Sequence, residues 1–202
     1  MKTETDNFDA EYWNNRFRIS DTPWDTGSIT TPLKNYFDQL TDKNIKILIP
    51  GAGNAHEAEY LYLKGFKNVF VLDISIEAVV NFKSRVPNFN IHHIVHEDFF
   101  EHQGKYDLIV EQTFFCALHP SLRKKYAQKM HSLLNSNGKL VGLLFNDTLN
   151  DDKPPFGGNM EEYKILFSPI FNLKVFEIAH NSIKPRNGRE IFIILQKTTI
   201  ID

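Results

Sequence analysis

The chain has 202 residues, of which 42% are hydrophobic and 13% aromatic, with 23 Lys and Arg against 25 Asp and Glu. This length and composition predict one folded domain with a sizeable core and exclude a disordered chain. The net charge of -2 shows no basic excess, so we expect no nucleic-acid partner.

The single cysteine, Cys116, allows no intramolecular disulfide, which is consistent with a reducing compartment. Residues 1–10 are polar and lack the apolar stretch of a signal peptide. No apolar run approaches the ~18 residues that a membrane helix needs. We therefore expect a cytoplasmic protein without a membrane partner.

Short apolar runs alternate with helical patterns through most of the chain. The predicted strands are 45–49, 69–72, 91–95, 106–110, 139–145, 173–178 and 190–196. The predicted helices are 55–64, 76–85, 121–134 and 161–167, the second ended by Pro87 and the third by the polar run 135–138. This alternation predicts a doubly wound, mainly parallel α/β sheet. No repeat or linker is visible, so we expect a single domain over 1–202, with an N-terminal extension, 1–40, and an α/β core, 45–197.

A glycine-rich turn follows the first predicted strand. Gly51 and Gly53 would let a ligand approach the backbone and leave the amides of the next helix free. A tight turn without a ligand is the alternative. His56 occupies the place of the third glycine of the dinucleotide fingerprint, which argues against a pyrophosphate site and hence against a nicotinamide-dependent reductase.

Acidic residues follow the next two strands. Asp73 can accept hydrogen bonds from both hydroxyls of a ribose. Asp98 and Phe99 can contact the amine and the ring face of an adenine. Asp98 alone would be a solvated loop acid, but together with Asp73, Gly51 and Gly53 it predicts a nucleoside site.

Glu111 directly follows the fourth predicted strand, at the end of the sheet where ligands bind. Its carboxylate could hold the amino group of a methionine moiety. It could equally cap the helix that follows, because a helix N-terminus favours negative charge. The sequence leaves both roles open.

Two tryptophan-centred clusters precede the predicted sheet, around Trp13 and Trp24. If the extension folds back as a lid, these rings could stack on the nucleoside and face a sulfonium cation. The alternative is that they only anchor the extension. We expect no metal site, because the adjacent His92 and His93 would point to opposite faces of a strand.

The sequence resembles the thiopurine S-methyltransferase family, particularly its thiol and halide methyltransferase branch, over nearly the whole chain. Pieces shared with many methyltransferases are Leu-Ile-Pro-Gly-Ala-Gly (48–53), Val-Leu-Asp-Ile-Ser (71–75) and Glu-Asp-Phe-Phe (97–100). More specific pieces are Tyr-Trp-Asn-Asn-Arg-Phe (12–17), Pro-Trp-Asp (23–25), Phe-Phe-Cys-Ala (114–117) and Pro-Pro-Phe (154–156).

The resemblance implies a seven-stranded, Rossmann-like class I methyltransferase fold with an antiparallel last strand, and S-adenosylmethionine as the cofactor. The residues that it implies as cofactor contacts are Trp13, Phe17, Trp24, Gly51, Asp73, Asp98 and Phe99. Glu111 matches a family aspartate. Gln112 stands where the thiopurine-methylating members have an arginine, which puts thiopurine preference in doubt.

The expected reaction is in-line transfer of a methyl group to a small thiol, sulfide, thiocyanate or halide. Because such an anion is already a nucleophile, we expect no catalytic acid or base, and rate enhancement from alignment and desolvation. Phe114, Phe115 and Phe156 are the expected wall of the acceptor pocket. The alternatives are methylation of a thiopurine or another small molecule, and a non-catalytic adenosylmethionine-binding protein. We expect a monomer.

Overall fold

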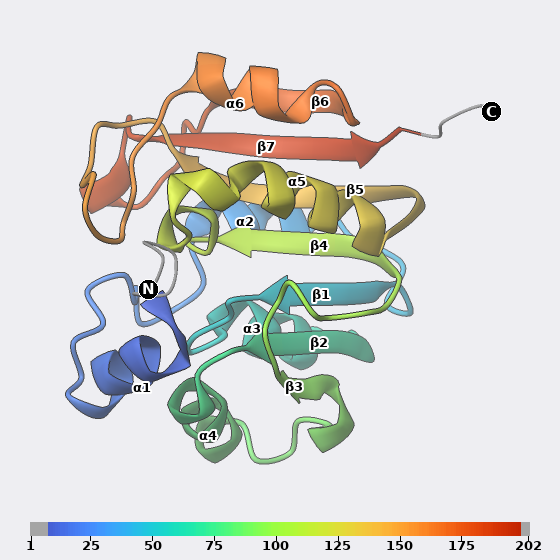
Figure 1. Ribbon diagram of the computed structural model, residues 1–202. Helices are drawn as coiled ribbons and strands as arrows, with labels where there is room; N and C mark the ends of the chain where they lie inside the picture. Colours follow the sequence, from blue (N-terminus) through green and yellow to red (C-terminus); the bar gives the residue numbers. More distant parts are fainter. Residues whose placement is uncertain (1–7, 199–202) are drawn as a thin grey trace. The chain divides into compact units, whose positions relative to one another are not determined.

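A computed structural model of the chain describes residues 8–198 (Figure 1). Its residues form two compact units, the first ending at His102 and the second starting at Gln103. The single domain over 1–202, with an extension to residue 40, stays a prediction. Among residues 8–198, no helix combines the length and the apolar character that crossing a membrane requires.

The first unit contains three parallel strands in the order β3-β2-β1. Its elements in chain order are α1 (Ala10–Arg18), α2 (Thr31–Phe37), β1 (Lys46–Pro50), α3 (His56–Leu63), β2 (Asn68–Asp73), α4 (Ile76–Arg85) and β3 (Ile94–His96). In β1, Ile47, Leu48 and Ile49 are all buried, as expected for a parallel strand covered on both faces. Because β1 and β2 are parallel neighbours, their carboxyl ends lie at the same edge.

Helix α4 begins beside this edge, and its local sequence determines where it starts and which face it buries. Ser75 caps the helix by accepting a hydrogen bond from the backbone N–H of Ala78 at 3.2 Å. Ala78, Val79 and Phe82 form its buried face. Figure 1 shows α1 beside α4 within this unit, so the N-terminal helix packs next to the end of β2.

The second unit contains four strands in the order β4-β5-β7-β6. Its elements are β4 (Tyr106–Gln112), α5 (Arg123–Leu133), β5 (Leu134–Phe145), α6 (Met160–Phe167), β6 (Phe171–Ile178) and β7 (Glu190–Lys197). β4 and β5 are parallel, and β7 is antiparallel to both β5 and β6. The seven strands and the antiparallel last strand confirm the expected α/β fold class.

The third strand is shorter than the sequence predicts. Ile91–His93 forms a 3₁₀ turn, and only Ile94–His96 pairs with β2. The side chain of Asn90 accepts a hydrogen bond from the backbone N–H of His92 at 3.0 Å, which starts this turn. His92 and His93 therefore lie in a turn, so strand alternation does not decide where they point.

The region around α5 also differs from the prediction. Pro120–Leu122 forms a separate 3₁₀ turn before the helix, which begins at Arg123. The polar run 135–138 does not end the helix, because Leu134 is already extended and begins β5. The run instead makes the register between β4 and β5 irregular, with Asn137 in a left-handed conformation.

Candidate functional site

The loop after β1 turns sharply at the carboxyl edge of the first unit. Gly51, Gly53 and Ala55 all have positive φ, at 56°, 54° and 51°. A Cβ added to Gly53 would lie 3.6 Å from Cζ of Phe17 and 3.9 Å from Nε1 of Trp24. The backbone of this loop is therefore covered by aromatic rings of the N-terminal segment.

Asp73, at the end of β2, is fixed by two backbone donors. Its Oδ2 accepts a hydrogen bond from Gly53 N at 2.8 Å, and its Oδ1 accepts one from Ser75 N at 2.8 Å. Burial raises the pKa of this carboxyl, while the two N–H donors lower it. Each oxygen retains acceptor capacity, so the geometry suits a ligand with two adjacent hydroxyls.

Asp98 and Phe99 follow β3 in a short turn. Asp98 is exposed, and its Oδ1 accepts a hydrogen bond from Phe100 N at 2.7 Å, which orders the turn. The Phe99 ring is buried and stands edge-on to the ring of Phe100 at 5.3 Å. Phe100 is the more exposed of the two rings, which the sequence could not distinguish.

The aromatic side chains of the N-terminal segment form one cluster. Trp24 meets the rings of Trp13 and Phe17 edge-on, at centroid distances of 5.5 and 5.9 Å. The guanidinium of Arg16 lies 4.8 Å from the centroid of Trp24. One face of Trp24 therefore already carries a cation.

In the second unit, Glu111 is fully buried at the end of β4. Its Oε1 accepts hydrogen bonds from Phe114 N at 2.8 Å and Phe115 N at 2.9 Å, and its Oε2 accepts one from the hydroxyl of Tyr126. Burial raises the pKa of this carboxyl to about 7. Both oxygens are therefore engaged within the unit, by the start of the 3₁₀ turn Phe115–Ala117 and by a side chain of α5, and not by the N-terminus of α5.

The segment after β4 contacts the β5–α6 loop, residues 146–159. Phe156 N donates a hydrogen bond to Cys116 O at 2.7 Å, and the ring of His119 stands edge-on to Phe156 at 5.5 Å. Phe115 and Phe156 are buried, whereas Phe114 is partly exposed. Of the three expected wall residues, Phe114 is thus the least buried.

Arg123 connects α5 to the same loop and to α6. Its buried guanidinium donates to the backbone oxygen of Gly157 at 2.5 Å and pairs with Glu162. It also lies over the ring of Phe115, 5.1 Å from the centroid. Sequence reasoning misses this role, because nothing in the neighbours of Arg123 along the chain indicates burial.

The sequence-predicted residues thus gather in two sets. The first unit brings together Trp13, Phe17, Trp24, Gly51, Gly53 and Asp73, and the second brings together Glu111, Phe114, Phe115 and Phe156. In the part of the chain that the structure describes, no group of three or more His, Cys, Asp or Glu side chains could hold a metal ion.

A solved structure of a methyltransferase has a similar fold. It is 1,6-didemethyltoxoflavin-N1-methyltransferase from Burkholderia thailandensis with bound S-adenosylhomocysteine, which superposes with a TM-score of 0.76. The match covers 94% of this chain and 87% of that chain at 15% identity, and at this identity it shows the fold alone.

The family follows from the sequence comparison. The family model described as thiopurine S-methyltransferase matches residues 8–198, and the chain belongs to this family. The chain is 31% identical over 185 residues to probable thiol methyltransferase 2 of Arabidopsis thaliana, across 88% of this chain and 81% of that protein. It is 29% identical, with the same coverage, to thiocyanate methyltransferase 1 of Brassica oleracea. The protein is an S-adenosylmethionine-dependent methyltransferase.

Proposed function

We propose that this enzyme methylates a small anionic nucleophile, namely a thiolate, hydrosulfide, thiocyanate or halide. The enzyme must also bind adenosylmethionine. The observation that carries this part of the proposal is the carboxylate of Asp73, held by Gly53 N and Ser75 N at the end of β2. The names of the thiol and thiocyanate methyltransferases to which the chain is similar support the acceptor class.

The residues of the first unit fit adenosylmethionine. Asp73 would accept hydrogen bonds from the ribose hydroxyls, the Gly51–Gly53 backbone would face the ligand, and Asp98 and Phe99 would contact the adenine. Phe17 and Trp24 lie against the same loop, and Trp13 packs on Trp24. When bound, adenosylmethionine supplies an electrophilic methyl group on a sulfonium.

Glu111 is assigned a positioning role rather than contact with the cofactor amino group. Its hydrogen bonds to Phe114 N and Phe115 N set the turn that presents Phe114. Tyr126 holds the second oxygen from α5. The carboxylate of Glu111 therefore orders the backbone that carries the expected wall residues Phe114 and Phe115.

Two buried side chains near the expected acceptor wall, Cys116 and Tyr126, are poor proton acceptors. Burial raises the pKa of Cys116 to about 12, so this thiol stays protonated, and the hydroxyl of Tyr126 has a pKa well above its usual value. Glu111 is engaged by three donors. This set suits an acceptor that arrives as an anion and needs only alignment and desolvation.

The ring of His119 contacts Phe156. Substituting His119 therefore tests whether the reaction needs a base on the enzyme. Its Nδ1 accepts from Ser121 N at 3.3 Å, which engages one ring nitrogen. With wild type and His119→Asn, kcat/KM is measured from pH 6 to 9 for one alkyl thiol and for thiocyanate, which has no proton to lose.

The proposal predicts that thiol methylation follows the thiolate fraction in both proteins, while thiocyanate methylation stays flat. Loss of thiol activity alone in His119→Asn would contradict it, because that pattern requires a base on the enzyme.

Two further elements of the proposal come from the sequence. The acceptor is a small molecule and not a nucleic acid, and the enzyme acts as a monomer in the cytoplasm. Methylation of a thiopurine is the second candidate for the acceptor, favoured by the family match and disfavoured by Gln112 in place of arginine. The family match argues against the third possibility, a non-catalytic adenosylmethionine-binding protein.

A further inference from the structure

We infer that Asn14 and Asp25 are positioning residues for the cofactor, which hold the N-terminal segment, residues 8–25, on the two loops of the nucleoside site. The inference rests on the proposed function in one respect, that the site of Asp73 and Gly53 binds adenosylmethionine. Neither residue was a candidate from the sequence, since each is a polar side chain beside conspicuous tryptophans.

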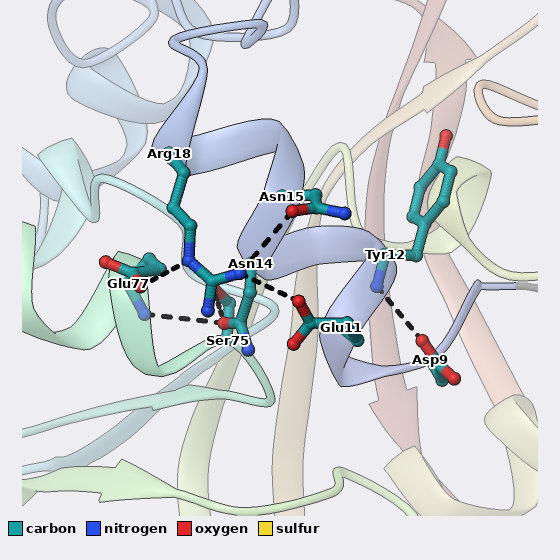
Figure 2. A network of polar contacts seen from close by, with 8 residues as sticks. All are labelled: Asp9, Glu11, Tyr12, Asn14, Asn15, Arg18, Ser75 and Glu77. Carbon is teal, nitrogen blue, oxygen red and sulfur yellow. Dashed lines mark hydrogen bonds and ion pairs between the residues drawn. The ribbon is translucent and has the colours of Figure 1, made fainter.

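Asn14 connects α1 to the end of β2. Figure 2 shows its side chain pointing from α1 toward Ser75 and Glu77 at the start of α4. Its Oδ1 accepts a hydrogen bond from the hydroxyl of Ser75 at 2.8 Å, and both side chains are buried. Ser75 N donates in turn to Oδ1 of Asp73. Ser75 alone therefore lies between Asn14 of the N-terminal segment and the carboxylate of Asp73, which is assigned to the ribose.

A second contact between the same helices is weaker. Arg18 pairs with Glu77 at 2.8 Å and with Glu11 at 2.7 Å, and the side chains of all three are about a third or more exposed (Figure 2). Exposed ion pairs of this kind contribute little. The buried hydrogen bond of Asn14 is therefore the interaction that places α1, because an unpaired buried polar group is costly.

Asp25 makes the second attachment, to the glycine loop. Its carboxylate accepts hydrogen bonds from the side chains of Asn54 at 2.5 Å and His56 at 2.7 Å, and from Gly27 N at 2.8 Å. Although desolvation opposes them, these donors lower the pKa of Asp25, which keeps it an anion. His56 stands where a dinucleotide fingerprint has its third glycine. The chain thus uses that position to hold its N-terminal segment.

Two rings of the aromatic cluster lie between the two attachments in the sequence. Phe17 follows Asn14 by one helical turn, and Trp24 directly precedes Asp25. Both rings face Gly53. Fixing both ends of this stretch fixes the rings against the loop, so the binding free energy need not include the cost of ordering them.

The experiment compares full-length Asn14→Ala and Asp25→Ala with two matched controls. Asn15→Ala changes the exposed neighbour on α1, and Asp42→Ala changes an exposed aspartate outside the segment. The dissociation constant of S-adenosylhomocysteine is measured by calorimetry, with tryptophan fluorescence as a report on Trp13 and Trp24. We expect the constant to rise about tenfold in each test variant, and less than about twofold in the controls.

A double-mutant cycle tests the attachment itself. If Asp25 acts through His56, then Asp25→Ala combined with His56→Ala weakens binding no more than Asp25→Ala does alone. Unchanged affinity for S-adenosylhomocysteine in Asn14→Ala and Asp25→Ala, even with lowered stability, would assign the two residues a purely structural role. That result would overturn this inference and leave the proposed function standing. No binding by the unsubstituted chain would instead overturn the proposed function, and the inference with it.

Discussion

Asp73 ends β2, Gly53 lies in the loop after the neighbouring strand β1, and the carboxylate of Asp73 accepts a hydrogen bond of 2.8 Å from the amide of Gly53. This one side chain therefore orders the glycine loop. A second backbone donor, Ser75 N, holds the other oxygen. The ribose-binding assignment rests on this preorganised carboxylate.

Asp73→Ala tests that assignment. We expect the dissociation constant of adenosylmethionine to rise roughly 10- to 100-fold, because hydrogen bonds to a charged acceptor are worth about 1.5–3 kcal/mol. Calorimetric titration measures it, with circular dichroism to check the fold. Asp107→Ala, at an exposed position, is the matched control and should bind as wild type does. Equal affinities in the two variants would refute the ribose role.

Glu111→Gln should change how stability depends on pH. The folded-state pKa of about 7 lies above the usual value of 4.5, so the unfolded chain loses this proton at lower pH than the folded chain does. The stabilisation is complete below about pH 4.5 and is lost as the pH rises through about 7. Gln keeps an acceptor for Phe114 N and Phe115 N and does not titrate.

Urea unfolding of both proteins at pH 5 and pH 8 measures this effect. Relative to wild type, Glu111→Gln should gain about 2 kcal/mol of unfolding free energy between the two pH values. A difference that stays constant with pH would show that Glu111 is ionised throughout and that burial does not govern its titration.

Gly142→Ala should destabilise the second unit. Gly142 pairs with Glu111 across β4 and β5, and an added Cβ would lie 2.2 Å from the backbone oxygen of Glu111. Because the backbone must shift, we expect a loss of about 3 kcal/mol in unfolding free energy. Gly188→Ala, with positive φ but open space, is the comparison and should lose about 1 kcal/mol. A smaller loss in Gly142→Ala would contradict the close strand approach.

Arg123→Met should loosen the β5–α6 loop. The substitution removes the hydrogen bond to Gly157 and the pairing with Glu162 but keeps much of the volume. We expect a loss of about 2 kcal/mol in stability and a raised KM for the acceptor, measured by urea unfolding and steady-state kinetics. Glu162→Gln, whose side chain is 46% exposed, should cost under about 1 kcal/mol. If Glu162→Gln lost as much stability as Arg123→Met, the ion pair with Glu162, and not the hydrogen bond to Gly157, would account for most of the effect.

Local patterns in the sequence predict most of the fold. The helix 76–85 agrees with α4 at both ends because a serine cap, a buried face and a following proline all indicate the same boundaries. The third strand was too long in the prediction, since Asn90 starts a turn through a side-chain hydrogen bond that apolar spacing does not reveal.

The sequence likewise predicts some residues of the candidate site and misses others. Gly51 and Asp73 could be found because strand ends place them at one edge. Asn14 and Asp25 could not, because their partners Ser75, Asn54 and His56 lie 29 to 61 residues away in the sequence. Nothing local marks such a polar side chain as buried or paired.

The most direct test of the central claim is transfer of a labelled methyl group from adenosylmethionine by the purified full-length enzyme. The acceptors are hydrosulfide, an alkyl and an aromatic thiol, thiocyanate, iodide and a thiopurine. We predict methylated product and stoichiometric S-adenosylhomocysteine with at least one of the small anionic acceptors, at higher kcat/KM than with the thiopurine. Turnover of the thiopurine alone would contradict the acceptor class. Cofactor binding without turnover of any acceptor would contradict methyl transfer to these nucleophiles altogether.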